Sequence, residues 1–182
     1  MLIAIVIVLT VLATFIKFGP FSITLALVPI IIGAILYGPG TGALLGAVFG
    51  LVVLITGLFG WDGGTVMLLL SQRPFALILI CLGKGAAAGA VSGLVYKALR
   101  KKGEKRAVVG SAIVCPLTNT LLFILGMLVF FMSTLESWAS GQGVLYFIIF
   151  GLTGVNFIIE LLTNLALTSA ITAIIKYKRS KG

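Results

Sequence analysis

The chain has 182 residues, of which 60% are hydrophobic and 9% are charged, with 13 Lys and Arg, 4 Asp and Glu, and no His. A mean hydropathy of +1.28 lies far outside the range of a soluble domain of this length and indicates an integral membrane protein. The net charge of +9 indicates attraction to anionic membrane lipid and a bias in membrane orientation. It does not indicate nucleic-acid binding, because no basic face is interleaved with exposed aromatic residues.

Six apolar segments are long enough to approach the roughly 20 residues that cross a bilayer. The first, "MLIAIVIVLTVLATFI", lacks a basic leader and a small-residue cleavage site, so we expect it to stay as a span. "YGPGTG" predicts a tight hairpin between the second and third segments. No linker divides residues 1–182, so the sequence predicts a single all-α transmembrane domain of six helices, at 2–17, 23–37, 41–58, 74–98, 107–133 and 144–176.

The basic residues predict the orientation, because cytoplasmic loops collect Lys and Arg. Ten of the thirteen lie either around the connection 99–106 or in the C-terminal tail. With six spans, both termini are then cytoplasmic and the connections 59–73 and 134–143 face outward. The ten residues are Lys97, Arg100, Lys101, Lys102, Lys105, Arg106, Lys176, Lys178, Arg179 and Lys181.

Glycines recur at intervals of four in two segments. Gly42, Gly46 and Gly50 lie in the third segment, and "GKGAAAGAVSG" carries the same spacing in the fourth, at residues 85, 89 and 93. Small residues at this spacing let helix backbones approach closely in a membrane. We expect packing within the chain, and docking onto another membrane subunit is the alternative.

Three polar residues recur in the sixth segment, where "VNFIIELLTN" carries Asn156, Glu160 and Asn164. At about 100° per residue they share one face of a helix. Lys84 and Asn119, in the fourth and fifth segments, lie at comparable depth, about 20 Å from the cytoplasmic basic residues. A charge at the bilayer centre costs at least about 2.5 kcal/mol, so we expect these groups to face the bundle interior.

Two interpretations of these polar groups remain open. Lys84 and Glu160 could form an ion pair that only joins two helices, or the whole group could line an outward-open pocket. We favour the pocket, because a buried ion pair adds little stability and needs no flanking Asn residues. Trp61 could belong to its lid, although it also fits an interfacial anchor, as does Trp138. The predicted substrate-binding residues are Trp61, Arg73, Lys84, Asn119, Asn156, Glu160 and Asn164.

Catalytic chemistry finds little support in the sequence. With no His, and with Cys81 and Cys115 in separate segments, we find no pattern for a metal cluster or an activated nucleophile. "CLGKGAAAG" lacks the upstream Gly and the following Ser or Thr of a Walker A loop. We therefore predict a protein that is not an enzyme and has no cofactor; an ATPase that drives it must be another chain.

Three stretches carry a family resemblance that covers nearly the whole chain. "ITLALVPIIIGAILYGPGTGALLGAVFGLVVLI", "CPLTNTLLFILGMLVFF" and "NFIIELLTNLAL" resemble the substrate-binding S components of energy-coupling factor (ECF) vitamin transporters. The resemblance implies a six-helix subunit of a prokaryotic plasma membrane that captures a water-soluble vitamin or a similar micronutrient from outside. It also implies delivery through a transmembrane T component and two cytoplasmic ATPases.

The family resemblance and the charged residues together narrow the choice among candidate substrates. "LVPIIIGAIL" and "TNTLLF" are most similar to pantothenate-type S components. A carboxylate ligand would give Lys84 or Arg73 a partner, and pantothenate and folate carry one, whereas thiamine is a cation and riboflavin needs aromatic stacking. The family often has an Ala-x-x-x-Ala pattern in its first helix for contact with the T component. Here Ala4 and Ala13 are nine apart, which leaves the docking surface open.

A different class of function stays open at the level of sequence. An autonomous secondary transporter or channel would use Glu160 as its proton- or cation-coupling group. Such transporters commonly show repeats with broken helices near the midplane, and the sequence shows no convincing repeat.

Overall fold

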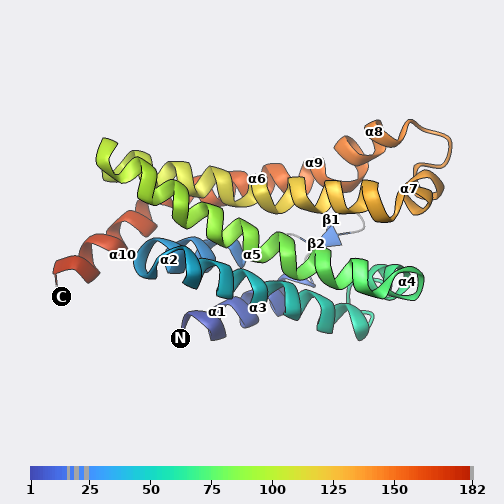
Figure 1. The fold of residues 1–182 in the computed structure, drawn as a ribbon, viewed down its shortest axis with the longest axis horizontal. Coiled ribbons are helices and arrows are strands. Elements are labelled where there is room, and N and C mark those ends of the chain that lie inside the picture. The colour runs from blue at the N-terminus through green and yellow to red at the C-terminus, as the bar shows by residue number, and fades with distance from the viewer. Residues whose placement is uncertain (16, 19–20, 23–24, 181–182) are drawn as a thin grey trace.

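The computed structural model describes residues 1–15, 17–18, 21–22 and 25–180. Lys181 and four residues of "KFGPFSIT", 19–20 and 23–24, lie outside the described residues. The predicted all-α fold is confirmed (Figure 1). Among the described residues the exception is one short antiparallel pair, β1 (Lys17–Phe18) with β2 (Phe21–Ser22).

Three helices are long and apolar enough to cross a membrane: α3 (Pro39–Leu58), α5 (Pro74–Leu99) with the 3₁₀ turn that follows it, and α6 (Glu104–Phe130). A bent pair, Val144–Thr153 with Asn156–Ala166, passes the same test as one unit. Two shorter apolar helices, α1 (Leu2–Ala13) and α2 (Leu27–Tyr37), precede them in the chain. Each of the six apolar segments predicted from the sequence therefore contains a helix.

The sixth segment differs most from its prediction. Instead of one helix over 144–176, the chain forms α8 (Val144–Tyr146), a π-helix (Phe147–Thr153), α9 (Gly154–Ala166) and α10 (Thr168–Ser180). The two halves of the bent pair meet at 44°. At the break, the Thr153 hydroxyl donates to the carbonyl oxygen of Ile148, at 2.8 Å, so a side chain takes part in the local backbone bonding.

The connections that the sequence predicts to face outward contain helices that the sequence did not indicate, α4 (Thr65–Gln72) and α7 (Met132–Ala139). Asp62 fixes the start of α4, because its carboxylate accepts the backbone N–H of Gly64 at 3.0 Å and that of Val66 at 2.6 Å. The hydroxyl of Thr134 donates to the side-chain oxygen of Gln72 at 2.6 Å and so joins α7 to α4. Both helices are too short to give a clear periodic pattern.

Helices α3 and α5 pack backbone against backbone through their glycines. A Cβ on Gly46 would overlap the carbonyl group of Gly85, and one on Gly85 would overlap that of Gly46. Gly42 and Gly89 oppose each other in the same way. The prediction that these glycines pack within the chain is confirmed, and it explains why they repeat in two antiparallel helices.

Helix α5 also contacts α6 closely. The side chains of Ser92 and Ser111 are fully buried, and each hydroxyl donates to the other residue's carbonyl oxygen, at 3.4 and 3.0 Å. These bonds satisfy polar groups that lipid could not, and they fix the register of α5 on α6. Helix α5 thus lies between α3 and α6, and the three helices run side by side (Figure 1).

The two ends of the bundle differ in what they carry. Both chain ends lie toward the end where α5 turns into α6 through Arg100–Lys102, and α4, α7 and α8 lie at the opposite end (Figure 1). The arrangement agrees with the parity expected for six spans. Which end faces the cytoplasm stays a prediction from the basic residues.

Candidate functional site

A cavity of about 120 Å³ lies inside the bundle, between residues of α1, α3, α4, α5, α6 and α9. Since one water needs about 10 to 15 Å³ of such space, the cavity can hold a cluster of waters or a small organic molecule. Its lining residues are Thr10, Ala13, Thr14, Phe49, Val53, Thr56, Asp62, Val66, Leu69, Leu77, Cys81, Lys84, Asn119, Thr120, Phe123, Leu152, Thr153, Asn156, Phe157 and Glu160.

The cavity belongs to the half of the bundle that carries α4 and α7. Its lining comes from the last part of α3 and α6, and from the first part of α5 and α9. These parts all lie away from the Arg100–Lys102 turn (Figure 1). If that turn is cytoplasmic, as the basic residues predict, the cavity lies in the outer half of the membrane.

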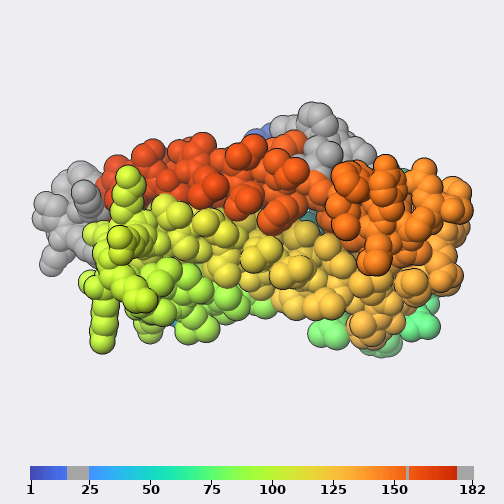
Figure 2. All heavy atoms as spheres, turned by 90° about the horizontal axis from the view of Figure 1, so that it is seen from above, coloured from blue at the N-terminus to red at the C-terminus, as the bar shows by residue number. Residues whose placement is uncertain are grey.

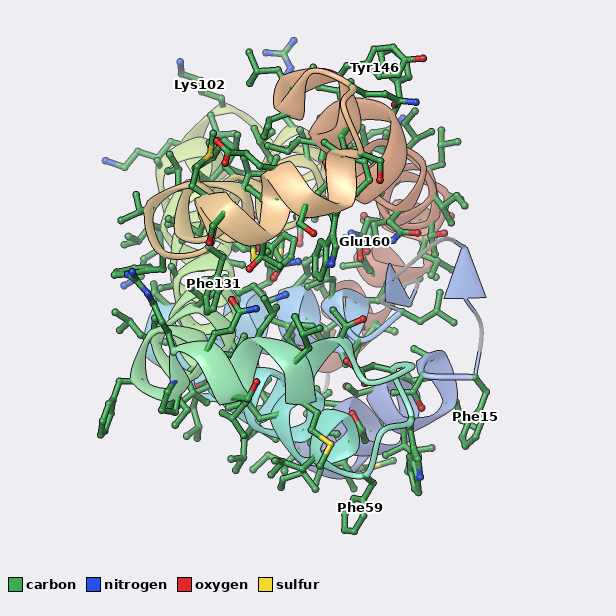
Figure 3. All side chains as sticks on the ribbon, turned by 90° about the vertical axis from the view of Figure 1, so that its right-hand side faces the viewer. Phe15, Phe59, Lys102, Phe131, Tyr146 and Glu160 are labelled. Carbon is green, nitrogen blue, oxygen red and sulfur yellow. The ribbon has the colours of Figure 1, made fainter. Side chains whose placement is uncertain are left out.

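Four of the seven predicted residues meet at this cavity: Lys84 from α5, Asn119 from α6, and Asn156 and Glu160 from α9. Helices α6 and α9 run side by side along the molecule (Figures 1 and 2), which places Asn119 near the polar stripe of α9. Seen along the bundle axis, the labelled Glu160 lies among the helices near the centre of the molecule (Figure 3). Its side chain is 5% exposed.

The other three predicted residues lie elsewhere. Asn164 follows Glu160 by one turn of α9 and is buried outside the cavity lining. Arg73 ends α4 at the surface, beside a separate hollow formed with Phe75, Leu79 and Phe130. Trp61 is 44% exposed and contacts the rings of Phe15 and Phe59. The structure thus does not bring Asn164, Arg73 or Trp61 to the cavity.

Lys84 is held by aromatic rings. Its ammonium nitrogen lies 4.9 Å from the ring centroid of Phe123 and 5.8 Å from that of Phe49, within the range of a cation–π interaction. Within the described residues no ion pair joins Lys84 to Glu160, so the direct pair considered from the sequence is not formed. The rings stabilise the charge weakly, and an ammonium group carries three N–H donors that can bind a stronger acceptor.

Asn119 has unused hydrogen-bonding capacity. Its side chain is 5% exposed, and its Oδ1 atom has no hydrogen-bond partner among the described residues. A buried polar atom without a partner costs about 1 to 3 kcal/mol. Because Asn119 lines the cavity, a ligand or water that donates a hydrogen bond there would recover that cost.

Sequence reasoning missed several polar residues of the cavity. Thr10 of α1, Thr14 directly after α1, and Thr56 of α3 all line it. Thr10 and Thr14 are four apart in an otherwise apolar segment, a spacing that places both on one helix face and could have indicated an inward orientation. Asp62 also lines the cavity, and it belongs to the connection 59–73, which the sequence predicts to supply a lid.

The all-α membrane fold agrees with what is found by comparison with known proteins. The family model described as "ECF transporter, substrate-specific component" matches residues 1–176. A search of curated proteins gave no match. This family consists of transporter subunits and is not a family of enzymes. The chain therefore belongs to the substrate-specific components of ECF transporters and is a multi-pass, substrate-binding membrane subunit.

Proposed function

We propose that the cavity is the substrate site and that the substrate is a water-soluble vitamin with a carboxylate, pantothenate in the first place. The observation that carries this proposal is the meeting of Lys84, Asn119, Asn156 and Glu160, from three helices, at one internal cavity. Ionisable groups inside a membrane bundle are costly, and by default they mark substrate or ion pathways.

The charges and hydrogen-bonding groups support a ligand of mixed polarity. Lys84, half-buried and held by two rings, suits a carboxylate, which would replace two weak ring contacts by charge-assisted hydrogen bonds. Asn119 and Glu160 suit hydroxyl or amide N–H groups of the same ligand. Pantothenate combines one carboxylate with an amide and two hydroxyls, whereas thiamine would bring a cation toward Lys84.

The chain would work as one subunit of a larger transporter. As a substrate-specific component it would capture the vitamin from outside a prokaryotic plasma membrane and deliver it together with a transmembrane T component and two cytoplasmic ATPases. The absence of a Walker A motif from its 182 residues supports a separate ATPase chain.

Ligand identification tests the proposal directly. Purified protein is denatured, released small molecules are identified by mass spectrometry, and the emptied protein is titrated with pantothenate, folate, riboflavin and thiamine in a thermal-shift assay. We expect pantothenate to be released and to raise the melting temperature most. Stabilisation by thiamine alone would contradict the carboxylate assignment, and stabilisation by none of the four would contradict the vitamin assignment.

A further inference from the structure

Three threonines line the cavity with their hydroxyl protons already engaged in hydrogen bonds: Thr10 of α1, Thr14 directly after α1, and Thr56 of α3. Thr10 Oγ1 lies 2.6 Å from the carbonyl oxygen of Val6, and Thr14 Oγ1 lies 2.6 Å from that of Val11. Thr56 Oγ1 lies 3.0 Å from the carbonyl oxygen of Val52 and 3.2 Å from that of Val53. All three side chains are at most 5% exposed.

The direction of these bonds follows from chemistry alone. A carbonyl oxygen can only accept, so each threonine hydroxyl must be the donor. A hydroxyl that has donated its proton keeps two lone pairs and can only accept further hydrogen bonds. Thr10, Thr14 and Thr56 therefore offer the cavity oxygen acceptors and no donors.

Other lining groups are of the same kind. Both carboxylate oxygens of Asp62 accept backbone N–H groups, and the hydroxyl of Thr153 donates to the carbonyl oxygen of Ile148. Asn119 adds its unpartnered Oδ1 atom. Acceptors thus border the cavity from α1 and the residue after it, from α3, from the loop before α4, from α6 and from the end of the π-helix. The Lys84 ammonium of α5 supplies charged donors, and the amide groups of Asn119 and Asn156 add neutral ones.

We propose that the hydroxyl oxygens of Thr10, Thr14 and Thr56, which we call the acceptor wall, accept hydrogen bonds from hydroxyl or N–H groups of the substrate. They thereby select a substrate that carries such groups over one that carries only an acid group. This inference rests on the proposed function and explains which substrates the proposed site would select. The carboxylate binds at Lys84, and the hydroxyl-bearing part of the molecule lies against the threonines. A vitamin with an acid group but no free hydroxyl or N–H would leave these acceptors without partners and bind weakly.

Isosteric substitution separates the oxygen from the shape of the side chain. The triple variant Thr10→Val, Thr14→Val, Thr56→Val removes the acceptors and keeps the side-chain volume, and the helix keeps its backbone hydrogen bonds. The matching triple Ser variant keeps the acceptors and removes the methyl groups. Thr172→Val is the control, because Thr172 makes the same bond to its own helix, at 2.7 Å to the carbonyl oxygen of Thr168, outside the cavity.

Affinity is measured by isothermal titration with pantothenate and with its analogue in which both hydroxyls are replaced by hydrogen. For the triple Val variant we expect about a 10- to 1,000-fold loss of affinity for pantothenate, the sum of three ordinary hydrogen bonds, and a smaller loss for the analogue, which keeps only its amide N–H as a donor. The Ser variant and Thr172→Val should stay within about threefold of the unmodified chain, well below the tenfold that one strong bond carries.

The outcomes distinguish the inference from the proposed function. If the triple Val variant melts like the unmodified chain and binds pantothenate equally well, the threonines do not recognise the substrate. The proposed substrate site is not contradicted by that result. If the Ser variant loses as much affinity as the Val variant, the methyl groups matter and the inference is again wrong. If the unmodified chain does not bind pantothenate, the proposed substrate falls, and the inference with it.

Discussion

Gly46 of α3 and Gly85 of α5 touch through their backbones, each occupying the space where the other's side chain would begin. Gly85 directly follows Lys84, and Phe49, one turn beyond Gly46, carries one of the two rings at the Lys84 ammonium. The glycine contact therefore sets the distance between the aromatic ring and the cation that it holds. Helix packing and site geometry are fixed by the same residues.

Gly46→Ala should destabilise the protein and weaken ligand binding. The added methyl group meets the carbonyl of Gly85, which is backbone and cannot rotate away, so α3 must move from α5. Overpacking of this kind costs about 1 to 3 kcal/mol. The matched control is Gly83→Ala on α5, where nothing lies within 4 Å of the new Cβ. Thermal melting in detergent should show a lower midpoint for Gly46→Ala than for the unmodified chain, and an unchanged midpoint for Gly83→Ala. Equal midpoints for the two variants would contradict the close packing.

Lys84→Met should reduce affinity for pantothenate and spare panthenol, the analogue in which an alcohol replaces the carboxylate. The substitution keeps a long apolar stem beside Phe49 and Phe123 and removes the charge. A charge-assisted hydrogen bond contributes about 1.5 to 3 kcal/mol, or roughly a 10- to 100-fold change in affinity. Lys97→Met, near the opposite end of α5, is the control. An equal loss for both compounds would assign Lys84 a structural role only.

Asn119→Ala and Asn164→Ala should behave differently, although both residues are buried and each has one side-chain atom without a partner among the described residues. Asn119 lines the cavity and Asn164 does not. We expect Asn119→Ala to weaken binding by about 1 to 3 kcal/mol without unfolding the protein. Asn164→Ala should leave affinity within error. Titration calorimetry on the two purified variants measures both affinities. A larger loss of affinity for Asn164→Ala than for Asn119→Ala would place the ligand nearer Asn164 on α9.

Orientation in the membrane can be measured by labelling single cysteines in intact cells. Cys81 and Cys115 are buried and are first replaced by Ala. New cysteines at Ser71 and Ser140, both exposed, should react with an impermeant reagent, and one at Lys102 should not. Lys102 is preferred to Gly103, whose φ of 122° disfavours a side chain. Reaction at Lys102 from outside would reverse the topology.

Uptake should require partners. The family assignment and the absence of a Walker A motif lead us to expect that the chain alone, in sealed vesicles with a proton gradient, binds pantothenate but does not concentrate it. Accumulation should appear when a T component and two ATPases are added with ATP. A gradient-driven accumulation by the lone chain that Glu160→Gln abolished would instead identify an autonomous secondary transporter.

Local properties of the sequence were enough to predict much of the fold. Hydrophobic length predicted the membrane class and the six apolar segments, and the spacing of Asn156 and Glu160 predicted a polar face toward the interior. Both follow from helix periodicity and from the cost of placing polar groups in lipid, and neither depends on which helices are neighbours. The four residues that meet at the cavity were found in this way.

Only the tertiary structure decided which polar residues share the cavity. The glycine contacts of α3 with α5, the Ser92–Ser111 bonds and the π-helix before α9 set how far each helix slides along its neighbour. One turn of register separates Glu160, at the cavity, from Asn164, outside it. The same packing brings Thr10 of α1 and Thr56 of α3 to one cavity, although 46 positions separate them in the sequence. A helix's own periodicity gives the direction in which a side chain points, and its neighbours determine what that side chain meets.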